Sequence, residues 1–176
     1  MKEFGYVRVG AIVNKLALAN PSENAKELVK NIKEAHKKGI TIVVTPELAL
    51  TGYTCGDLFL QEKLLNAALL GLQEVLEATK DIDIVAILGM PLATNNRLFN
   101  TAVVINKGKI LGVIPKTYIP NYNEFYEDRW FSSSLNLKDK YIEILGQTVF
   151  FGTDLLFQDE KKKEITFAIE ICEDLW

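Results

Sequence analysis

Hydrophobic and polar positions in the first half of the chain follow the periods of strand, helix, strand and helix in turn. Residues 6–14 predict a buried strand, and the β-branched run at 40–45 predicts a strand that is buried on both faces. The segment NPSE at 20–23 has the polar cap, early proline and glutamate of a helix start. A second helix is expected at 57–79. Leucine and alanine occur almost all round it, which predicts burial on more than one side, by another layer or a partner subunit.

The second half of the chain is dominated by strand and turn patterns. Residues 83–90 predict a strand, and 101–116 predict a hairpin that turns at Asn106–Gly108. An aromatic and charged loop at 117–131 is followed by two short strands. A last hairpin, turning at 158–163, leads to a terminal strand that ends at Cys172. This order predicts an α/β layered fold with a mixed sheet.

Composition narrows the classes of function. The 176 residues fit one domain, 1–176, and 20 basic against 23 acidic side chains give no electrostatic reason to expect nucleic-acid binding. The sequence has no apolar run long enough to cross a membrane. Its two cysteines make no disulfide framework, so we expect a reducing cytoplasm, and without a CxxC pair no metal site is indicated.

Three reactive residues follow apolar strand patterns: Glu47, Lys116 and Cys172. Each could simply end a strand, which is a common place for a polar group. If the strands run parallel, however, the three residues meet at one rim of the sheet, where α/β proteins bind ligands. A glutamate there could take the thiol proton and a lysine could stabilise an oxyanion. A Cys–His pair is not expected, because the single histidine, His36, falls in the last turn of the first helix and is predicted to pack beside the core.

Three longer motifs contain these residues: PELALTGYTCGDLF at 46–59, PKTYIPNYNEFYEDRWF at 115–131 and EICEDLW at 170–176. In this order they resemble the carbon–nitrogen hydrolase (nitrilase) superfamily. More narrowly, they are similar to the glutaminase domain of glutamine-dependent NAD⁺ synthetases. The resemblance covers essentially the whole chain. It implies a four-layer α-β-β-α sandwich, truncated here after the nucleophile strand.

The resemblance also implies catalytic roles. Glu47 would be the general base and later the acid, Lys116 would stabilise the oxyanion, and Cys172 would attack the side-chain amide of glutamine to form a thioester. The backbone N–H of Glu173 would complete the oxyanion hole. Supporting roles would fall to Glu127, as a second glutamate that holds the charges, and to Tyr122, as a contact for glutamine.

Further partners follow from the resemblance alone. The glutaminase step would need no cofactor. ATP and Mg²⁺ would serve a C-terminal synthetase domain that lies outside this sequence and uses the ammonia to amidate deamido-NAD⁺. The family and the leucine-rich second helix both favour a homo-oligomer. Two alternatives remain: another carbon–nitrogen hydrolase, such as an ω-amidase or carbamoylase, and an inactive truncated domain with a role in assembly.

Overall fold

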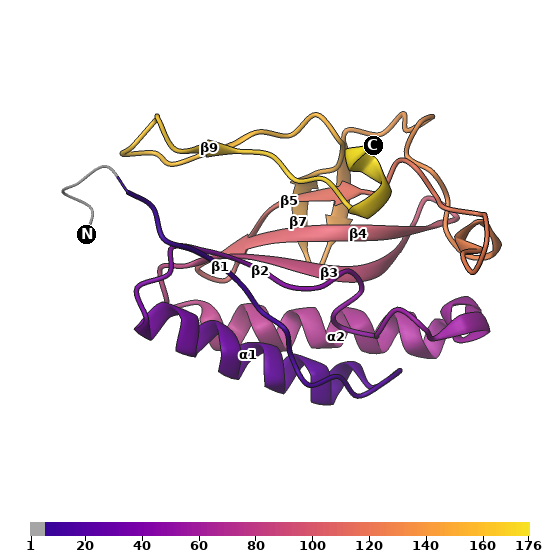
Figure 1. Cartoon of the computed structure of the whole chain (residues 1–176), viewed down its shortest axis with the longest axis horizontal. Helices are drawn as coiled ribbons and strands as arrows, with labels where there is room; N and C mark the ends of the chain where they lie inside the picture. Colours follow the sequence, from indigo (N-terminus) through magenta and orange to yellow (C-terminus); the bar gives the residue numbers. More distant parts are fainter. Residues whose placement is uncertain (1–5) are drawn as a thin grey trace.

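A mixed sheet with the strand order β1-β2-β3-β4-β5 forms the centre of the molecule (Figure 1). This computed structural model describes residues 6–176. The strands are β1 Val9–Ala11, β2 Ile42–Val44, β3 Val85–Thr94, β4 Arg97–Asn106 and β5 Lys109–Pro115. The first three run parallel, and β4 is antiparallel to both β3 and β5. Strands β2 and β5 therefore run in the same direction, and their carboxyl ends lie at the same rim of the sheet.

Two helices cover one face of this sheet, α1 (Pro21–Lys37) and α2 (Glu62–Thr79) (Figure 1). The predicted start of α1 is confirmed, because the side chain of Asn20 accepts a hydrogen bond of 3.3 Å from the backbone N–H of Glu23. The main core lies between the helices and the sheet. Its fully buried members include Leu28, Ile32, Leu72, Val75, Leu88 and Val103. Burial of such side chains is the main favourable term in folding.

The opposite face carries a smaller cluster under the last part of the chain. Strands β8 (Phe157–Gln158) and β9 (Thr166–Phe167) form a hairpin above β3 to β5, and an extended segment follows (Figure 1). Ile169 and Ile171 in this segment pack towards the sheet. The segment ends at the short 3₁₀ helix η4 (Cys172–Leu175), so the last residues are held over the rim.

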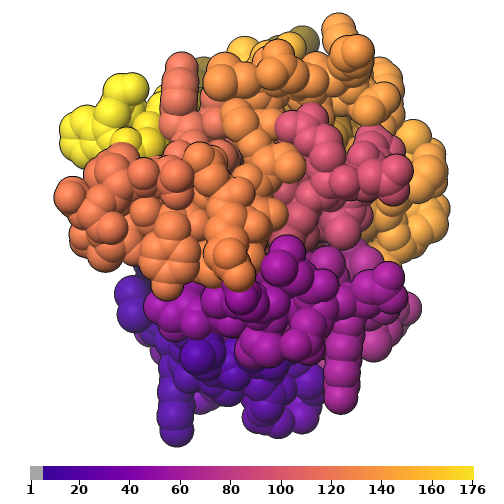
Figure 2. Space-filling view, turned by 90° about the vertical axis from the view of Figure 1, so that its right-hand side faces the viewer, coloured from indigo at the N-terminus to yellow at the C-terminus, as the bar shows by residue number. Residues whose placement is uncertain are grey.

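The remaining elements build the side of the molecule next to that rim. Strands β6 (Tyr141–Ile144) and β7 (Gln147–Phe150) form a hairpin that lies against β5. The loop between β5 and β6 contains the 3₁₀ helix η3 (Glu127–Arg129), and a second one, η2 (Gly56–Leu60), precedes α2. In Figure 2 the loop between β5 and β6, in orange, sits directly above the helical layer in indigo and purple.

Several sequence predictions about individual elements are wrong. Strand β1 is shorter than 6–14 and is not buried, with Val9 66 % exposed at the edge of the sheet. Strand β2 is buried on one face, and Val44 on the other face is 42 % exposed. In contrast, α2 is buried on more than one side as predicted, by α1 and by the sheet, and Leu70 on its remaining side is 64 % exposed. His36 is exposed at the end of α1 instead of packing beside the core.

Most of the predicted terminal strand does not pair with a neighbouring strand. Burial alternates along 165–171 as predicted, but the structure pairs the backbone into β9 at Thr166–Phe167 and leaves 168–171 extended. The segment packs its side chains on the sheet, but its backbone forms no strand pairing with the sheet. Cys172 therefore begins a 3₁₀ turn instead of ending a strand. The hairpin between β4 and β5, with Lys107 and Gly108 in the left-handed region, is confirmed.

The mixed α/β architecture predicted from the pattern is confirmed at the level of layers. The described residues supply one helical layer and one sheet of the four layers that the family resemblance implies. Across residues 6–176, no helix is both long and apolar enough to cross a membrane.

Candidate active site

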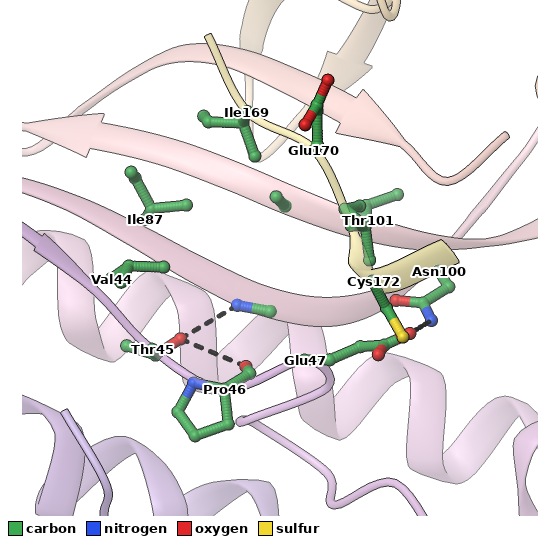
Figure 3. Close-up of a pocket in the computed structure, with 13 residues that line it drawn as sticks. Val44, Thr45, Pro46, Glu47, Ile87, Asn100, Thr101, Ile169, Glu170 and Cys172 are labelled. Atoms are coloured by element: carbon green, nitrogen blue, oxygen red, sulfur yellow. Dashed lines mark hydrogen bonds between the residues drawn. The ribbon is translucent and has the colours of Figure 1, made fainter. Parts of the chain in front are cut away.

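The turn after β2 places Glu47 at the rim of the sheet. The hydroxyl of Thr45 accepts a hydrogen bond of 3.1 Å from the backbone N–H of Gly89 on β3 (Figure 3). A Cβ on Gly89 would lie 2.4 Å from the carbonyl oxygen of Pro46 and 2.5 Å from the nitrogen of Leu48. Only glycine leaves room for the turn to lie flush on β3, so this residue fixes where Glu47 projects.

Lys116 is the centre of the charged cluster. It follows β5 directly, its side chain has no exposed surface, and its Nζ lies 2.8 Å from Oε1 of Glu47. The same Nζ lies 3.0 Å from both carboxylate oxygens of Glu127. Burial opposes the charge on Lys116, but the hydrogen bonds and charges of the two glutamates outweigh it and raise the pKa of Lys116 above its usual value. The lysine is therefore held as a buried cation.

Glu127 links this cluster to the rest of the fold. It begins η3, is 2 % exposed, and accepts a hydrogen bond of 2.5 Å from the hydroxyl of Tyr53. Burial, and then the hydrogen bond and charge of Glu127, raise the pKa of Tyr53, so its phenol stays a donor. Sequence reasoning gave Tyr53 no role. Its partner lies 74 residues away, and no local spacing signals the contact.

Cys172 lines the same cavity as Glu47. Figure 3 shows its sulfur by the carboxylate of Glu47, to which the Asn100 side chain on β4 is hydrogen-bonded. Its backbone φ of +50° lies in the left-handed region, which is uncommon for residues other than glycine and is concentrated at functional sites. The structure thus brings together the three residues that the sequence placed at one rim.

Opposing influences act on the thiol of Cys172. Burial raises the pKa of Cys172, the charge of Glu47 raises it further, and Glu127 adds to this. The charge of Lys116 and the backbone N–H of Glu173 lower it, but the net direction is upward. The neutral thiol is therefore the resting form near pH 7, and a nucleophilic thiolate needs a base that takes its proton.

Short tethers connect the η4 turn to the segment after Lys116. The carboxylate of Asp174 accepts hydrogen bonds from the backbone N–H groups of Thr117, at 3.0 and 3.2 Å, and Tyr118, at 2.8 Å. The hydroxyl of Tyr122 donates to both carboxylate oxygens of Glu173, at 2.9 and 3.0 Å. These contacts hold the nucleophile segment next to the lysine segment. Nothing in the sequence pattern singled out Asp174.

The cavity that Glu47 and Cys172 line has a volume of about 190 Å³. At about 30 Å³ per water molecule, it has room for a small polar group. Its polar lining comes from Thr45, Glu47, Asn100, Thr101 and Glu170 together with Cys172. Tyr122 is half exposed and is not among the lining residues as the structure describes them. Within residues 6–176, no group of three or more His, Cys, Asp or Glu side chains is arranged to hold a metal ion.

A thiol and a carboxylate that line one cavity, with a buried ammonium bonded to that carboxylate, can perform acyl transfer. The carboxylate can accept the thiol proton and return it to a leaving group, and the ammonium can stabilise negative charge on a carbonyl oxygen. This chemistry suits an amide, which is a poor electrophile with a poor leaving group.

Comparisons with known proteins agree with this chemistry. The family model described as Carbon-nitrogen hydrolase matches residues 8–176. The chain is 38 % identical over 174 residues to the glutamine-dependent NAD(+) synthetase of Mycobacterium tuberculosis, covering 99 % of this chain and 26 % of that protein. The corresponding protein of Aquifex aeolicus is 29 % identical over 154 residues, which cover 88 % of this chain and 24 % of its own length. The chain thus spans about a quarter of the length of these relatives.

Solved structures share the fold. A glutamine-dependent NAD(+) synthetase from Cytophaga hutchinsonii superposes with a TM-score of 0.85 and 27 % identity, over 96 % of this chain and 28 % of that one. An amidase from Nesterenkonia sp. shares the fold with a TM-score of 0.61 and 17 % identity, over 81 % of this chain and 53 % of that one. The chain belongs to the carbon–nitrogen hydrolase family.

Proposed function

We propose that this chain hydrolyses the side-chain amide of glutamine through a thioester on Cys172. The observation that carries the proposal is the arrangement of Glu47 and Cys172 around one cavity, with the fully buried Lys116 bonded to Glu47 at 2.8 Å. The choice of glutamine is supported by the relatives that match 99 % of the chain, which are named as glutamine-dependent enzymes.

The first half of the reaction uses Glu47 as base and then as acid. Its carboxylate takes the proton of the Cys172 thiol while the sulfur forms a bond to the amide carbon. The carbonyl oxygen becomes an oxyanion, which Lys116 and the backbone N–H of Glu173 stabilise. Glu47 then gives its proton to the nitrogen, the C–N bond breaks and ammonia leaves. A raised thiol pKa suits this sequence, because the proton is still present to be transferred.

The second half releases the acid product. A water molecule gives a proton to Glu47 and attacks the thioester carbon, and the same oxyanion contacts stabilise the second tetrahedral intermediate. The C–S bond breaks, Cys172 recovers the proton from Glu47, and glutamate leaves. Glu127 supports both halves, because it holds Nζ of Lys116 at 3.0 Å. Tyr122 is proposed to contact glutamine outside the cavity lining, next to Glu173.

The proposal extends to the full-length protein through the relatives. Because they are named as NAD(+) synthetases and are about four times as long as the matched region, we propose that ammonia released here serves the ATP-dependent amidation of deamido-NAD⁺ in another domain. Residues 1–176 would then be the first part of the glutamine-hydrolysing domain. A synthetase partner would raise the activity of this chain above its level alone.

The direct test is release of glutamate from glutamine by this chain and by the full-length protein. Wild-type protein is expected to release glutamate, and Cys172→Ala is expected to release none. Cys55→Ala is the matched control, because Cys55 is buried in a separate apolar cluster and should leave turnover intact. Turnover by Cys172→Ala would contradict the proposal. Hydrolysis of monocarboxylic amides without hydrolysis of glutamine would favour an ω-amidase instead.

A further inference from the structure

Asn100 has an unusual hydrogen-bonding state in the wall of the cavity. It lies on β4, is 1 % exposed, and its Nδ2 donates to Oε1 of Glu47 at 2.5 Å. Its Oδ1 is the buried side-chain polar atom that lacks a hydrogen-bond partner among the residues the structure describes. Buried acceptors are nearly always paired, so an unpaired one on a residue that lines the cavity together with Glu47 and Cys172 indicates a place for a donor from a ligand.

The orientation of this amide group is fixed by its neighbour. Rotating the side chain by half a turn would set Oδ1 against the carboxylate of Glu47, with two acceptors facing each other. The stable arrangement therefore directs Nδ2 to Glu47 and leaves Oδ1 without a partner, on a residue that lines the same cavity as Cys172. The hydroxyls of Thr45 and Thr101, which also line the cavity, are already engaged with Gly89 and Met90.

We propose that Asn100 is a substrate-contacting residue that selects the leaving group: its Oδ1 accepts a hydrogen bond from an N–H of the scissile carboxamide. This inference rests on the proposed amide hydrolysis and adds to it a determinant of specificity. The ligand class is a primary carboxamide, as opposed to a carboxylic ester of the same acid. A site with a buried acceptor rejects a substrate that lacks the matching N–H, because the acceptor then stays unpaired.

The reaction gives this contact a definite purpose. Before the C–N bond breaks, the nitrogen of the tetrahedral intermediate must direct its lone pair at the protonated Glu47. Its N–H bonds must then point elsewhere, and Oδ1 of Asn100 can accept one of them. Because Nδ2 of the same side chain holds Glu47, one residue orients both the acid and the leaving nitrogen. An ester oxygen would instead place a lone pair against Oδ1.

The test compares hydrolysis of glutamine with hydrolysis of glutamate γ-methyl ester by this chain. The measured quantity is the ratio of the two kcat/KM values, which does not depend on the fraction of protein that is folded. Loss of the contact to Glu47 in Asn100→Ala slows both reactions and cancels in the ratio. Loss of the contact to the carboxamide slows only glutamine, so the amide-to-ester ratio should fall about tenfold or more, the effect of one buried hydrogen bond.

Two further variants sharpen the result. Asn100→Asp keeps an acceptor oxygen but loses the donor to Glu47, so both rates should fall while the ratio stays within about threefold of wild type. Asn106→Ala, at the far end of β4, is the matched control and should change neither rate nor ratio. An unchanged ratio in Asn100→Ala would overturn the inference and leave the proposed function standing. Failure of the wild-type chain to hydrolyse either compound would overturn both.

Discussion

Lys116 and Glu47 sit just beyond the carboxyl ends of strands β5 and β2, whereas Cys172 follows an extended segment that packs on the sheet through its side chains. The lysine is fully buried, with both glutamates within 3.0 Å of its Nζ. The cysteine is exposed, and polar tethers from Asp174 and Glu173 hold the turn that carries it. The base and the cation are therefore preorganised by the sheet, while the position of the nucleophile depends on the packing of Ile169 and Ile171 and on a few hydrogen bonds.

Such a division suits covalent catalysis. The groups that must stabilise charge gain most from rigidity in a site that excludes water, because reorganisation in the reaction is then small. The thiol, in contrast, must approach a substrate that has entered the cavity. Variants on the two sides should therefore behave differently, with large losses of stability on the lysine side and small ones on the cysteine side.

The largest effect is expected for Lys116→Met. It removes the cation from between two carboxylates and leaves the buried charge of Glu127 and the partly buried charge of Glu47 uncompensated. Breaking a buried ion pair in this way lowers the free energy of unfolding by about 3–5 kcal/mol. Urea unfolding followed by circular dichroism measures the change. The matched control is Lys26→Met, which loses the exposed pair with Glu23. Its urea unfolding midpoint should equal that of wild type within experimental error. An equally stable Lys116→Met would contradict the proposed rigidity of this side.

A smaller and different effect is expected for Asp174→Ala. The variant loses the hydrogen bonds to Thr117 and Tyr118 and frees the η4 turn to move away from the lysine. Glutamate release should fall about tenfold, the effect of one hydrogen bond to a charged group, with little change in the unfolding midpoint. Asp174→Asn keeps an acceptor oxygen and should retain most of the activity. If both variants are fully active, the tethers do not position the nucleophile.

The sequence predicted the lysine side of the site better than the cysteine side. Strands β2 and β5 carry clear apolar runs, so the sequence indicated that Glu47 and Lys116 each follow a strand. They lie at one rim because the two strands run in the same direction. The alternation before Cys172 also predicted which side chains face the sheet. It could not reveal that the backbone there stays unpaired, because the period of two is the same for a strand and for an extended segment.

Contacts between distant residues were the part that pattern analysis missed. Tyr53 reaches Glu127 across 74 positions, and Asn100 reaches Glu47 across 53. Gly89 matters because a backbone passes where its side chain would be, and this has no signature in the sequence. The exposure of Val9 was likewise beyond prediction, since an apolar run does not say whether a strand lies at the edge of its sheet.

In the proposed mechanism, Glu47 takes the proton of a neutral Cys172 thiol. The measurement that tests it most directly is the pH dependence of Cys172 alkylation by iodoacetamide, with peptide mass spectrometry to separate Cys172 from the buried Cys55. In wild type, burial and then the charge of Glu47 raise the pKa of Cys172, so alkylation should titrate above the range of an ordinary thiol. Glu47→Gln removes that charge, so the titration should move to lower pH while glutamine hydrolysis is lost. A wild-type thiol that titrates below the ordinary range, or a Glu47→Gln variant with an unchanged titration and normal turnover, would contradict the claim.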